Sequence, residues 1–384
     1  MPSNNYLRLA GLFFVHSFSR GILLSVIPLQ TLALTGDAQR TSTLLFAVSA
    51  GGILAALMTP MVIQRVGSYL TFLLGCALMF VSVILLASND VVYFSAGLFC
   101  HVFSIAASEV TLTLYILAKV PRRELTRFEP WRILFTVLAL CIGPFVGVYF
   151  QKTFFHQLPY GISAIFVVLS IVYFRWLGLH RVAIPSSRSM NVNPMRYLGG
   201  YFYQPRLRLA YALVLARSCW WTMFVIYTPI YAERSGLGEL TGAALVSIGT
   251  AWTLSVPFWG WVARRYGVRS LMQVGFFITS ALTTLVYIYA GSPIVASIVL
   301  VVSALGATML DGVGNVLFYR AVHARERAEM TAVFSTYRDL GQLATPGLYA
   351  VLLTFLTLPV VFSSAAVWMF VAGYFCRFIP SRMK

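Results

Sequence analysis

Long apolar stretches fill this chain and are separated by short polar connections. Runs of 18 or more predominantly apolar residues recur along nearly the whole length, and a helix of that length crosses a lipid bilayer. The pattern predicts an all-α membrane protein, because a spanning helix satisfies its own backbone hydrogen bonds. Twelve spans are predicted, over residues 7–33, 41–63, 70–88, 91–118, 130–150, 159–179, 208–232, 241–263, 270–290, 293–318, 330–355 and 357–379.

The longest polar interruption lies at the centre of the chain and carries prolines, serines and several arginines. Such a composition is typical of a linker between two compact parts. The predicted domains are an N-terminal six-helix bundle over 1–179, a cytoplasmic linker over 180–207 and a C-terminal six-helix bundle over 208–384.

The two halves repeat each other at a spacing of about 200 residues, and the repeat includes charges inside apolar segments. Glu109 and Asp311 lie 202 positions apart, and Arg20 and Arg217 lie 197 apart. Matching ionisable residues in a duplicated bundle are typical of a transporter with a central site. The predicted fold is therefore two pseudo-symmetric six-helix bundles.

Composition and charge support a membrane location. The chain is 59% hydrophobic and 10% charged, which leaves too little polar surface for a soluble domain. Of its 28 Lys and Arg residues, 22 fall at the termini or in the even-numbered connections. This asymmetry predicts that both termini are cytoplasmic, and it assigns the net charge of +17 to anionic lipid headgroups rather than to a nucleic acid. Short outer loops without Asn-x-Ser/Thr favour a bacterial inner membrane.

The sequence lacks the usual signs of a metal centre or an enzyme. All five cysteines lie in apolar segments without metal-ligand spacing. There is no glycine loop of the phosphate-binding type and no Ser/His/Asp set at a membrane surface. We therefore expect no cofactor, no metal and no enzymatic activity.

Ionisable residues within predicted helices are the candidates for chemistry, because an unpaired charge near the bilayer centre costs at least ~2.5–3.5 kcal/mol. Glu109 and Asp311 are candidate proton carriers, since desolvation favours a protonated acid whereas a nearby arginine favours the ionised form. The alternative is that Arg20–Glu109 and Arg217–Asp311 are fixed ion pairs, and both readings stay open. The full set is Arg20, Glu109, Arg217, Asp311, Arg338 and Asp339.

Neighbouring positions extend these candidate sites. His16 precedes Arg20 by four residues and His101 precedes Glu109 by eight, so each shares a helix face with a charge and could relay protons or simply form hydrogen bonds. Arg338 and Asp339 are expected to brace a cytoplasmic gate. An aromatic face one turn above Arg217 would suit an aromatic or amphipathic anion, or would lie in an interfacial belt; it comprises Trp220, Phe224 and Tyr227.

A loop in the second half runs Gly260-Trp-Val262-Ala263-Arg264-Arg265-Tyr-Gly267-Val-Arg269. It resembles the signature of the major facilitator superfamily, Gly-x-Leu-Ala-Asp-Arg-x-Gly-Arg-Arg. The first copy keeps only Arg65 and Gly67, and both copies lack the acid, with Gln64 and Arg264 in its place. In the family that acid helps to hold one conformation closed, so that latch is not expected here. The second copy contains Gly260, Val262, Ala263, Arg264, Arg265, Gly267 and Arg269.

A second resemblance is Gly143-Pro144-Phe-Val-Gly147, similar to the family's Gly-Pro-x-x-Gly motif of antiporters, which Pro346 echoes in the second half. Proline and glycine there produce a kinked, closely packed helix. Small residues also recur every fourth position on the second, fifth, eighth and eleventh predicted helices. We expect these four helices to form the contact between the halves.

The resemblance implies that helices 1, 4, 7 and 10 line a central cavity in a protein that works by alternating access. The expected function is proton-coupled efflux, by antiport, of a small organic solute. One alternative is import, by proton symport or uniport, of an organic anion that Arg20 and Arg217 would bind. Another, in a different class, is a non-transporting membrane receptor. Expected partners are the solute, protons and membrane lipids, and the expected state is a monomer.

Overall fold

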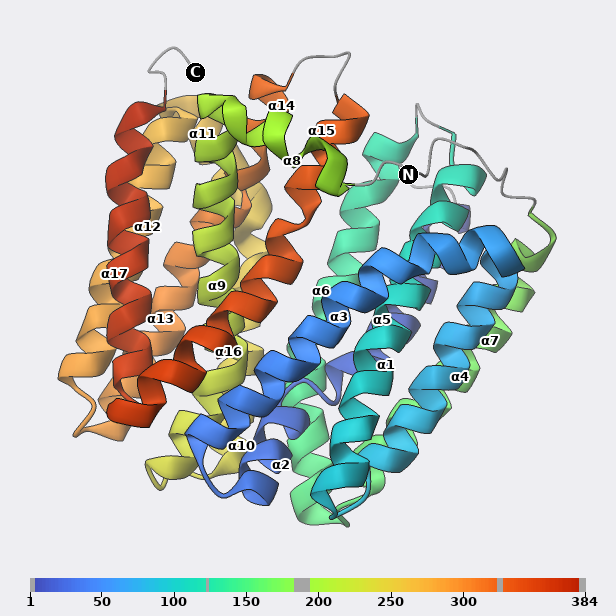
Figure 1. The fold of residues 1–384 in the computed structure, drawn as a ribbon, viewed down its shortest axis with the longest axis horizontal. Helices are drawn as coiled ribbons and strands as arrows, with labels where there is room; N and C mark the ends of the chain where they lie inside the picture. Colours follow the sequence, from blue (N-terminus) through green and yellow to red (C-terminus); the bar gives the residue numbers. More distant parts are fainter. Residues whose placement is uncertain (1–3, 122–123, 183–193, 323–326, 380–384) are drawn as a thin grey trace. The chain divides into compact units, whose positions relative to one another are not determined.

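The computed structural model describes residues 4–121, 124–182, 194–322 and 327–379, and all regular structure in these ranges is helical (Figure 1). Eleven segments are long and apolar enough to cross a membrane. The chain divides into two compact units, Met1–Met190 and Asn191–Lys384. This division falls inside the predicted linker, and each unit is described below by itself.

Unit 1 contains seven α-helices within the described residues, and each predicted span coincides with one or two of them. The first predicted span is interrupted, since its helix ends at Gly21 and resumes at Val26. The helices are α1 (Asn4–Gly21), α2 (Val26–Thr35), α3 (Ala38–Val66), α4 (Ser68–Leu86), α5 (Val91–Lys119), α6 (Leu125–Thr153) and α7 (Leu158–Trp176).

Unit 2 begins with a short helix from the predicted linker, α8 (Pro194–Tyr203). Three of the spans predicted for this unit are interrupted in the structure, although the apolar pattern predicted each as one continuous helix. They are 241–263, 293–318 and 330–355. The remaining helices are α9 (Pro205–Arg234), α10 (Glu239–Ala251), α11 (Val256–Tyr266), α12 (Val268–Ile288), α13 (Pro293–Asp311), α14 (Gly314–Ala321), α15 (Arg327–Ser335), α16 (Tyr337–Phe355) and α17 (Val360–Phe375). The pair α15 and α16 occupies the one predicted span that is not among the eleven.

The repeat is visible in the pairs of helices that pack against each other. In unit 1, α4 packs along α5 and α1 packs along α6; in unit 2 the corresponding helices α12 and α13, and α9 and α16, pack in the same way. The repeated loop glycines have the same role, because Gly67 and Gly267 both adopt a positive φ, of 87° and 89°, where one helix ends and the next begins. Glycine is the residue that takes this conformation without strain.

Glycines of the small-residue faces make close contacts inside their own units. A Cβ on Gly143 would clash with the backbone of Gly21, and one on Gly147 with the carbonyl oxygen of Ile22. In unit 2, Gly341 of α16 packs against Ser218 of α9. Small side chains let helix backbones approach closely in lipid, as these glycines do inside each bundle. A contact between the halves through the same four helices stays a prediction.

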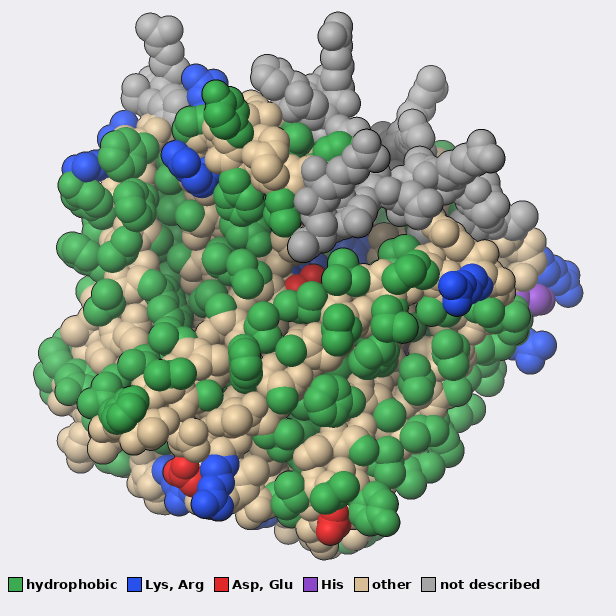
Figure 2. All heavy atoms as spheres, viewed as in Figure 1, with side chains coloured by type: hydrophobic (Ala, Val, Ile, Leu, Met, Phe, Trp, Pro, Cys, Tyr) green, Lys and Arg blue, Asp and Glu red, His purple; other side chains and the backbone are tan. Residues whose placement is uncertain are grey.

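The surface is consistent with a lipid environment. Hydrophobic side chains dominate the face shown in Figure 2, and the visible Lys and Arg side chains gather towards helix ends. Exposed large apolar side chains occur on nearly all the long helices. Such a surface would promote aggregation in water, but it is expected in a bilayer.

Candidate functional site

Each unit contains one arginine–acid ion pair at a helix interruption, and the pair in unit 1 joins Arg20 to Glu109. Arg20 lies in the last turn of α1, where the negative end of the helix dipole favours a cation. Its Nη1 pairs with Oε1 of Glu109, which lies within the continuous helix α5. The Arg20 side chain is 19% exposed and that of Glu109 is 45% exposed. The Glu109 end of this ion pair is therefore exposed.

Helix α6 supports the interruption that follows Arg20. The chain turns after Gly21 through two short-range bonds, from Leu23 N to Arg20 O and from Leu24 N to Gly21 O, both 3.1 Å. Gly143 and Gly147 of α6 pack directly on this turn, with Pro144 buried between them. The Gly-Pro-x-x-Gly sequence therefore fixes the backbone that carries Arg20.

The pair in unit 2 joins Arg217 to Asp311, and it is more enclosed. Arg217 lies within the continuous helix α9, whereas Asp311 is the last residue of α13. Their Nη1 and Oδ1 atoms are 3.3 Å apart, and the side chains are 9% and 21% exposed. Arg217 Nη1 also donates to the carbonyl oxygen of Leu310 at 3.3 Å. The guanidinium thus stabilises both the carboxylate and the negative end of α13.

Two further side chains complete this cluster, and the sequence analysis missed both. Trp221 donates its Nε1–H to Asp311 Oδ2 at 3.1 Å, and Arg217 Nη2 donates to the Tyr337 hydroxyl at 3.4 Å. Gly314 leaves room for the guanidinium, since a Cβ there would lie 2.6 Å from Arg217 Nη1. Tyr337 precedes the flagged Arg338 directly, which was the one available signal for it.

The aromatic face of α9 lies elsewhere than expected. Trp220, Phe224 and Tyr227 are fully buried in the core of unit 2, and Trp220 Nε1 donates to Thr283 Oγ1 at 3.1 Å. Trp220 also stacks on Phe224 with ring centroids 5.3 Å apart. These three side chains pack the bundle in this conformation, and their contact with solute stays a prediction. The adjacent Trp221 is the indole that reaches the charged pair.

The two candidate relay histidines both lie in unit 1. His16 is half-buried, and its Nδ1 lies 3.5 Å from Ser170 Oγ. His101 is buried, and its Nδ1 has no hydrogen-bond partner among the described residues. Their part in proton movement stays a prediction.

The candidate gating residues lie at helix ends. Arg65 and Arg264 are in the last turns of α3 and α11. Arg269 Nη1 donates to the carbonyl oxygen of Ile379 at 3.4 Å, and the Arg265 guanidinium lies 5.9 Å from the ring centroid of Trp261. The contacts of Arg265 and Arg269 lie within unit 2, and Arg65 and Arg264 each lie at the end of one helix.

The remaining predicted residues lie on α16 and flank the unit 2 cluster. Arg338 is exposed and donates from Nε to the Tyr337 hydroxyl at 3.3 Å, while Asp339 is half-buried. Pro346 is buried inside α16. In the part of the chain that the structure describes, no three His, Cys, Asp or Glu side chains converge as a metal site.

Comparison with solved structures shows the same fold. The peptide transporter POT bound to sulfate is 14% identical over 99% of this chain and 94% of that chain, with a TM-score of 0.77. The nucleoside transporter NupG is 14% identical over 98% of each chain, with a TM-score of 0.74. At these identities the likeness is one of fold alone.

A search of curated proteins found no match to this chain. A family model does match, over residues 9–346 and again over 244–383, and its description is Major Facilitator Superfamily. The repeated loop glycines, the paired bundles and this match agree, and the chain belongs to the major facilitator superfamily of membrane transporters.

Proposed function

We propose that this protein exports a small organic solute by proton-coupled antiport, with the Arg20–Glu109 pair as the coupling site. The observation that carries the proposal is the 45% exposure of Glu109 on a spanning helix. A carboxylate exposed to hydrocarbon is strongly unfavourable, so Glu109 is best explained by contact with water during the transport cycle. In this proposal the Arg217–Asp311 pair, which has additional hydrogen bonds, is the ion pair that separates less readily.

The charge state of Glu109 decides the coupling. An ionised Glu109 can accept a solute that carries a positive charge or a hydrogen-bond donor, and a proton that neutralises the acid displaces that solute. Solute and proton then compete for one side chain, which is the requirement for antiport. Alternating exposure of the competing ligands to the two sides of the membrane would export the solute.

A second candidate is symport of an organic anion, and one observation favours it. Arg20 Nε is buried and has no hydrogen-bond partner among the described residues. Protonation of Glu109 would free the whole guanidinium, which is suited to bind a carboxylate or phosphate in bidentate geometry. Proton and anion would then bind together rather than compete.

The sign of solute-driven proton movement separates the two candidates. The purified full chain is reconstituted in liposomes that contain a pH-sensitive dye, and organic cations, dipeptides, nucleosides and organic anions are added outside in turn. Antiport makes the lumen more alkaline as solute enters, whereas symport makes it more acidic. Movement of solute without any pH change would contradict proton coupling.

Substitution then tests the assigned residue. We expect Glu109→Gln to abolish the pH change, because glutamine carries no exchangeable charge. Glu129→Gln is the matched control, since Glu129 has the same 45% exposure and also pairs with an arginine, Arg132, but lies at the start of α6. Unaltered coupling in Glu109→Gln would remove this acid from the mechanism.

A further inference from the structure

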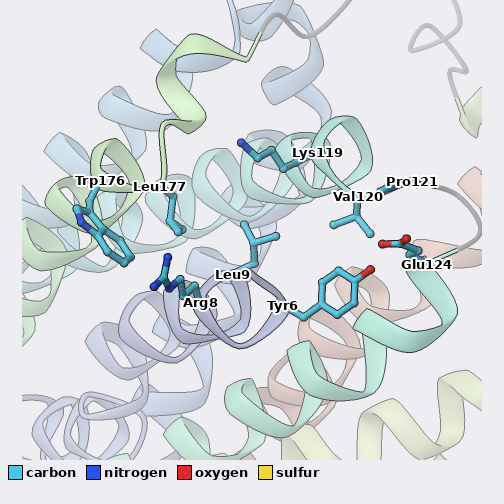
Figure 3. A pocket seen from close by; sticks show the side chains of 9 residues that line it. All are labelled: Tyr6, Arg8, Leu9, Lys119, Val120, Pro121, Glu124, Trp176 and Leu177. Carbon is cyan, nitrogen blue, oxygen red and sulfur yellow. The ribbon is translucent and has the colours of Figure 1, made fainter. Parts of the chain in front are cut away.

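A hollow of about 530 Å³ lies at one end of unit 1, where α1 begins and α5 and α7 end (Figure 3). Arg8, Lys119 and Trp176 line it, and all three side chains are exposed. The ends of these helices lie on the side of the membrane that the charge distribution assigns to the cytoplasm. The hollow is therefore at a membrane–water boundary and is separate from the Arg20–Glu109 pair.

The chemistry of the hollow suits a phosphate group. Arg8 and Lys119 come from different helices, and neither forms an ion pair with any described residue. The Arg8 guanidinium lies 5.4 Å from the ring centroid of Trp176, which orients its charge. Tyr6 and Glu124 lie at the opposite end of the hollow in Figure 3, away from Arg8 and Trp176.

An apolar stripe continues from the hollow along α7. Its members recur at helical spacing from Trp176, so they share one face of the helix. All are well exposed: Val172, Leu169 and Ile165. A ligand with a charged head and a long apolar chain would therefore find a complementary surface for both parts, whereas a free anion would use only the first.

The equivalent corner of unit 2 offers a natural comparison. It is lined by Arg206, Ala321 and Phe378, and it encloses only about 20 Å³. Ala321 and Phe378 correspond by the repeat to Lys119 and Trp176, and Arg206 lies one position beyond the equivalent of Arg8. Among the described residues that line it there is no second cation, and the indole is replaced by a smaller ring. Within the part of the chain that the structure describes, the two-cation lining is thus particular to unit 1.

We propose that this hollow binds the headgroup phosphate of an anionic phospholipid, with Arg8 and Lys119 as its ligands, Trp176 at the interface and an acyl chain along the α7 stripe. Lys and Arg near a membrane surface each attract anionic lipid by about 1 kcal/mol, which corresponds to about 5-fold in affinity. The site is independent of the proposed transport chemistry, so either can fail without the other.

Lipid titration of the purified full chain tests the proposal. Dioctanoyl phosphatidylglycerol, dioctanoyl phosphatidylcholine and inorganic phosphate are added separately, and bound lipid is counted by native mass spectrometry while thermal stability is recorded. We expect one phosphatidylglycerol to be retained, with little binding of phosphatidylcholine. Equal protection by inorganic phosphate alone would overturn the lipid assignment.

Variants identify the ligands. Arg8→Gln and Lys119→Gln should each weaken phosphatidylglycerol binding about 5-fold, and the double variant about 30-fold. Arg206→Gln in unit 2 is the matched control and should leave binding unchanged; an equal loss there would show that any cationic corner suffices and would overturn the site.

A charge-preserving variant covers the case in which the neutral double variant fails to fold. Arg8→Lys combined with Lys119→Arg keeps both positive charges and should retain the lipid within about 2-fold, because the attraction is mainly electrostatic. Loss of binding in that folded variant would overturn the assignment of these two side chains.

Discussion

The two units differ in which residue of the arginine–acid ion pair lies on the interrupted helix. In unit 1 the helix that carries the arginine is interrupted just after Arg20, while the acid lies on a continuous helix; in unit 2 the helix of the acid ends at Asp311, while Arg217 lies on a continuous helix. The consequence is a difference in enclosure. Arg217 reaches the open end of α13 and gains additional partners, whereas Glu109 remains 45% exposed.

This difference assigns different tasks to two pairs that look alike in sequence. A pair with several hydrogen bonds and little exposure is costly to separate, because each partner would be left buried and charged. An exposed pair loses less when it opens, because water replaces the partner. We therefore expect unit 1 to carry the exchangeable pair and unit 2 the structural one.

The largest expected effect comes from removing one arginine from each unit. Arg217→Met leaves Asp311 enclosed without its cation, so we expect the free energy of unfolding to fall by about 3–5 kcal/mol. Arg20→Met leaves a half-exposed acid, and we expect a loss of about 1 kcal/mol or less. Both values are measured by denaturant titration of helical content in detergent micelles.

A double variant controls for the loss of side-chain volume. Arg217→Met combined with Asp311→Leu removes both charges, and it should recover part of the stability lost by Arg217→Met alone. Equal destabilisation by Arg20→Met and Arg217→Met would contradict the division of tasks between the units.

Sequence reasoning located the charged pairs because both the acids and the arginines repeat at a spacing of about 200 residues. The spacing of Glu109 and Asp311, and the depth of both within apolar runs, was sufficient to expect an acid and an arginine together in each unit. The family and the bundle fold followed from the span pattern and from the loop around Gly267, whose positive φ explains why glycine occupies that position.

The interruptions themselves could not be predicted. Neither Gly21–Ser25 nor Gly312–Val313 contains a proline, and the glycines there are also tolerated inside continuous membrane helices, so they did not mark a break. Contacts distant in sequence decide the outcome, such as Gly147 against Ile22. In a similar way, periodicity placed Trp220 and Phe224 on one face of α9 but could not show that this face points into the core.

The second prediction compares the glycines that support the two pairs. A Cβ at Gly147 would meet a backbone carbonyl, which cannot move without shifting the turn after Arg20, so we expect Gly147→Ala to cost about 1–3 kcal/mol. A Cβ at Gly314 would meet the end of the Arg217 side chain, which can move, so Gly314→Ala should cost less.

Gly161→Ala on α7 is the control for these substitutions, because a Cβ there meets nothing within 4 Å. It should be neutral or slightly stabilising, since alanine favours a helix over glycine by about 1 kcal/mol. The same denaturant titration ranks the three variants, and a larger loss in Gly314→Ala than in Gly147→Ala would reverse the comparison.

The smallest expected effect distinguishes the two adjacent indoles of α9. Trp221→Phe removes the donor to Asp311, and Trp220→Phe removes a donor to the neutral hydroxyl of Thr283; both bonds measure 3.1 Å. Each loss should cost about 1 kcal/mol. Only the first should depend on pH, because an ionised carboxylate accepts a hydrogen bond more strongly than a protonated one. We therefore expect the stability difference between wild type and Trp221→Phe to shrink as the pH is lowered, while that of Trp220→Phe stays constant. If both differences follow pH in parallel, Trp221 does not stabilise a charged Asp311, and the enclosed character of the unit 2 pair must come from Arg217 and the end of α13 alone.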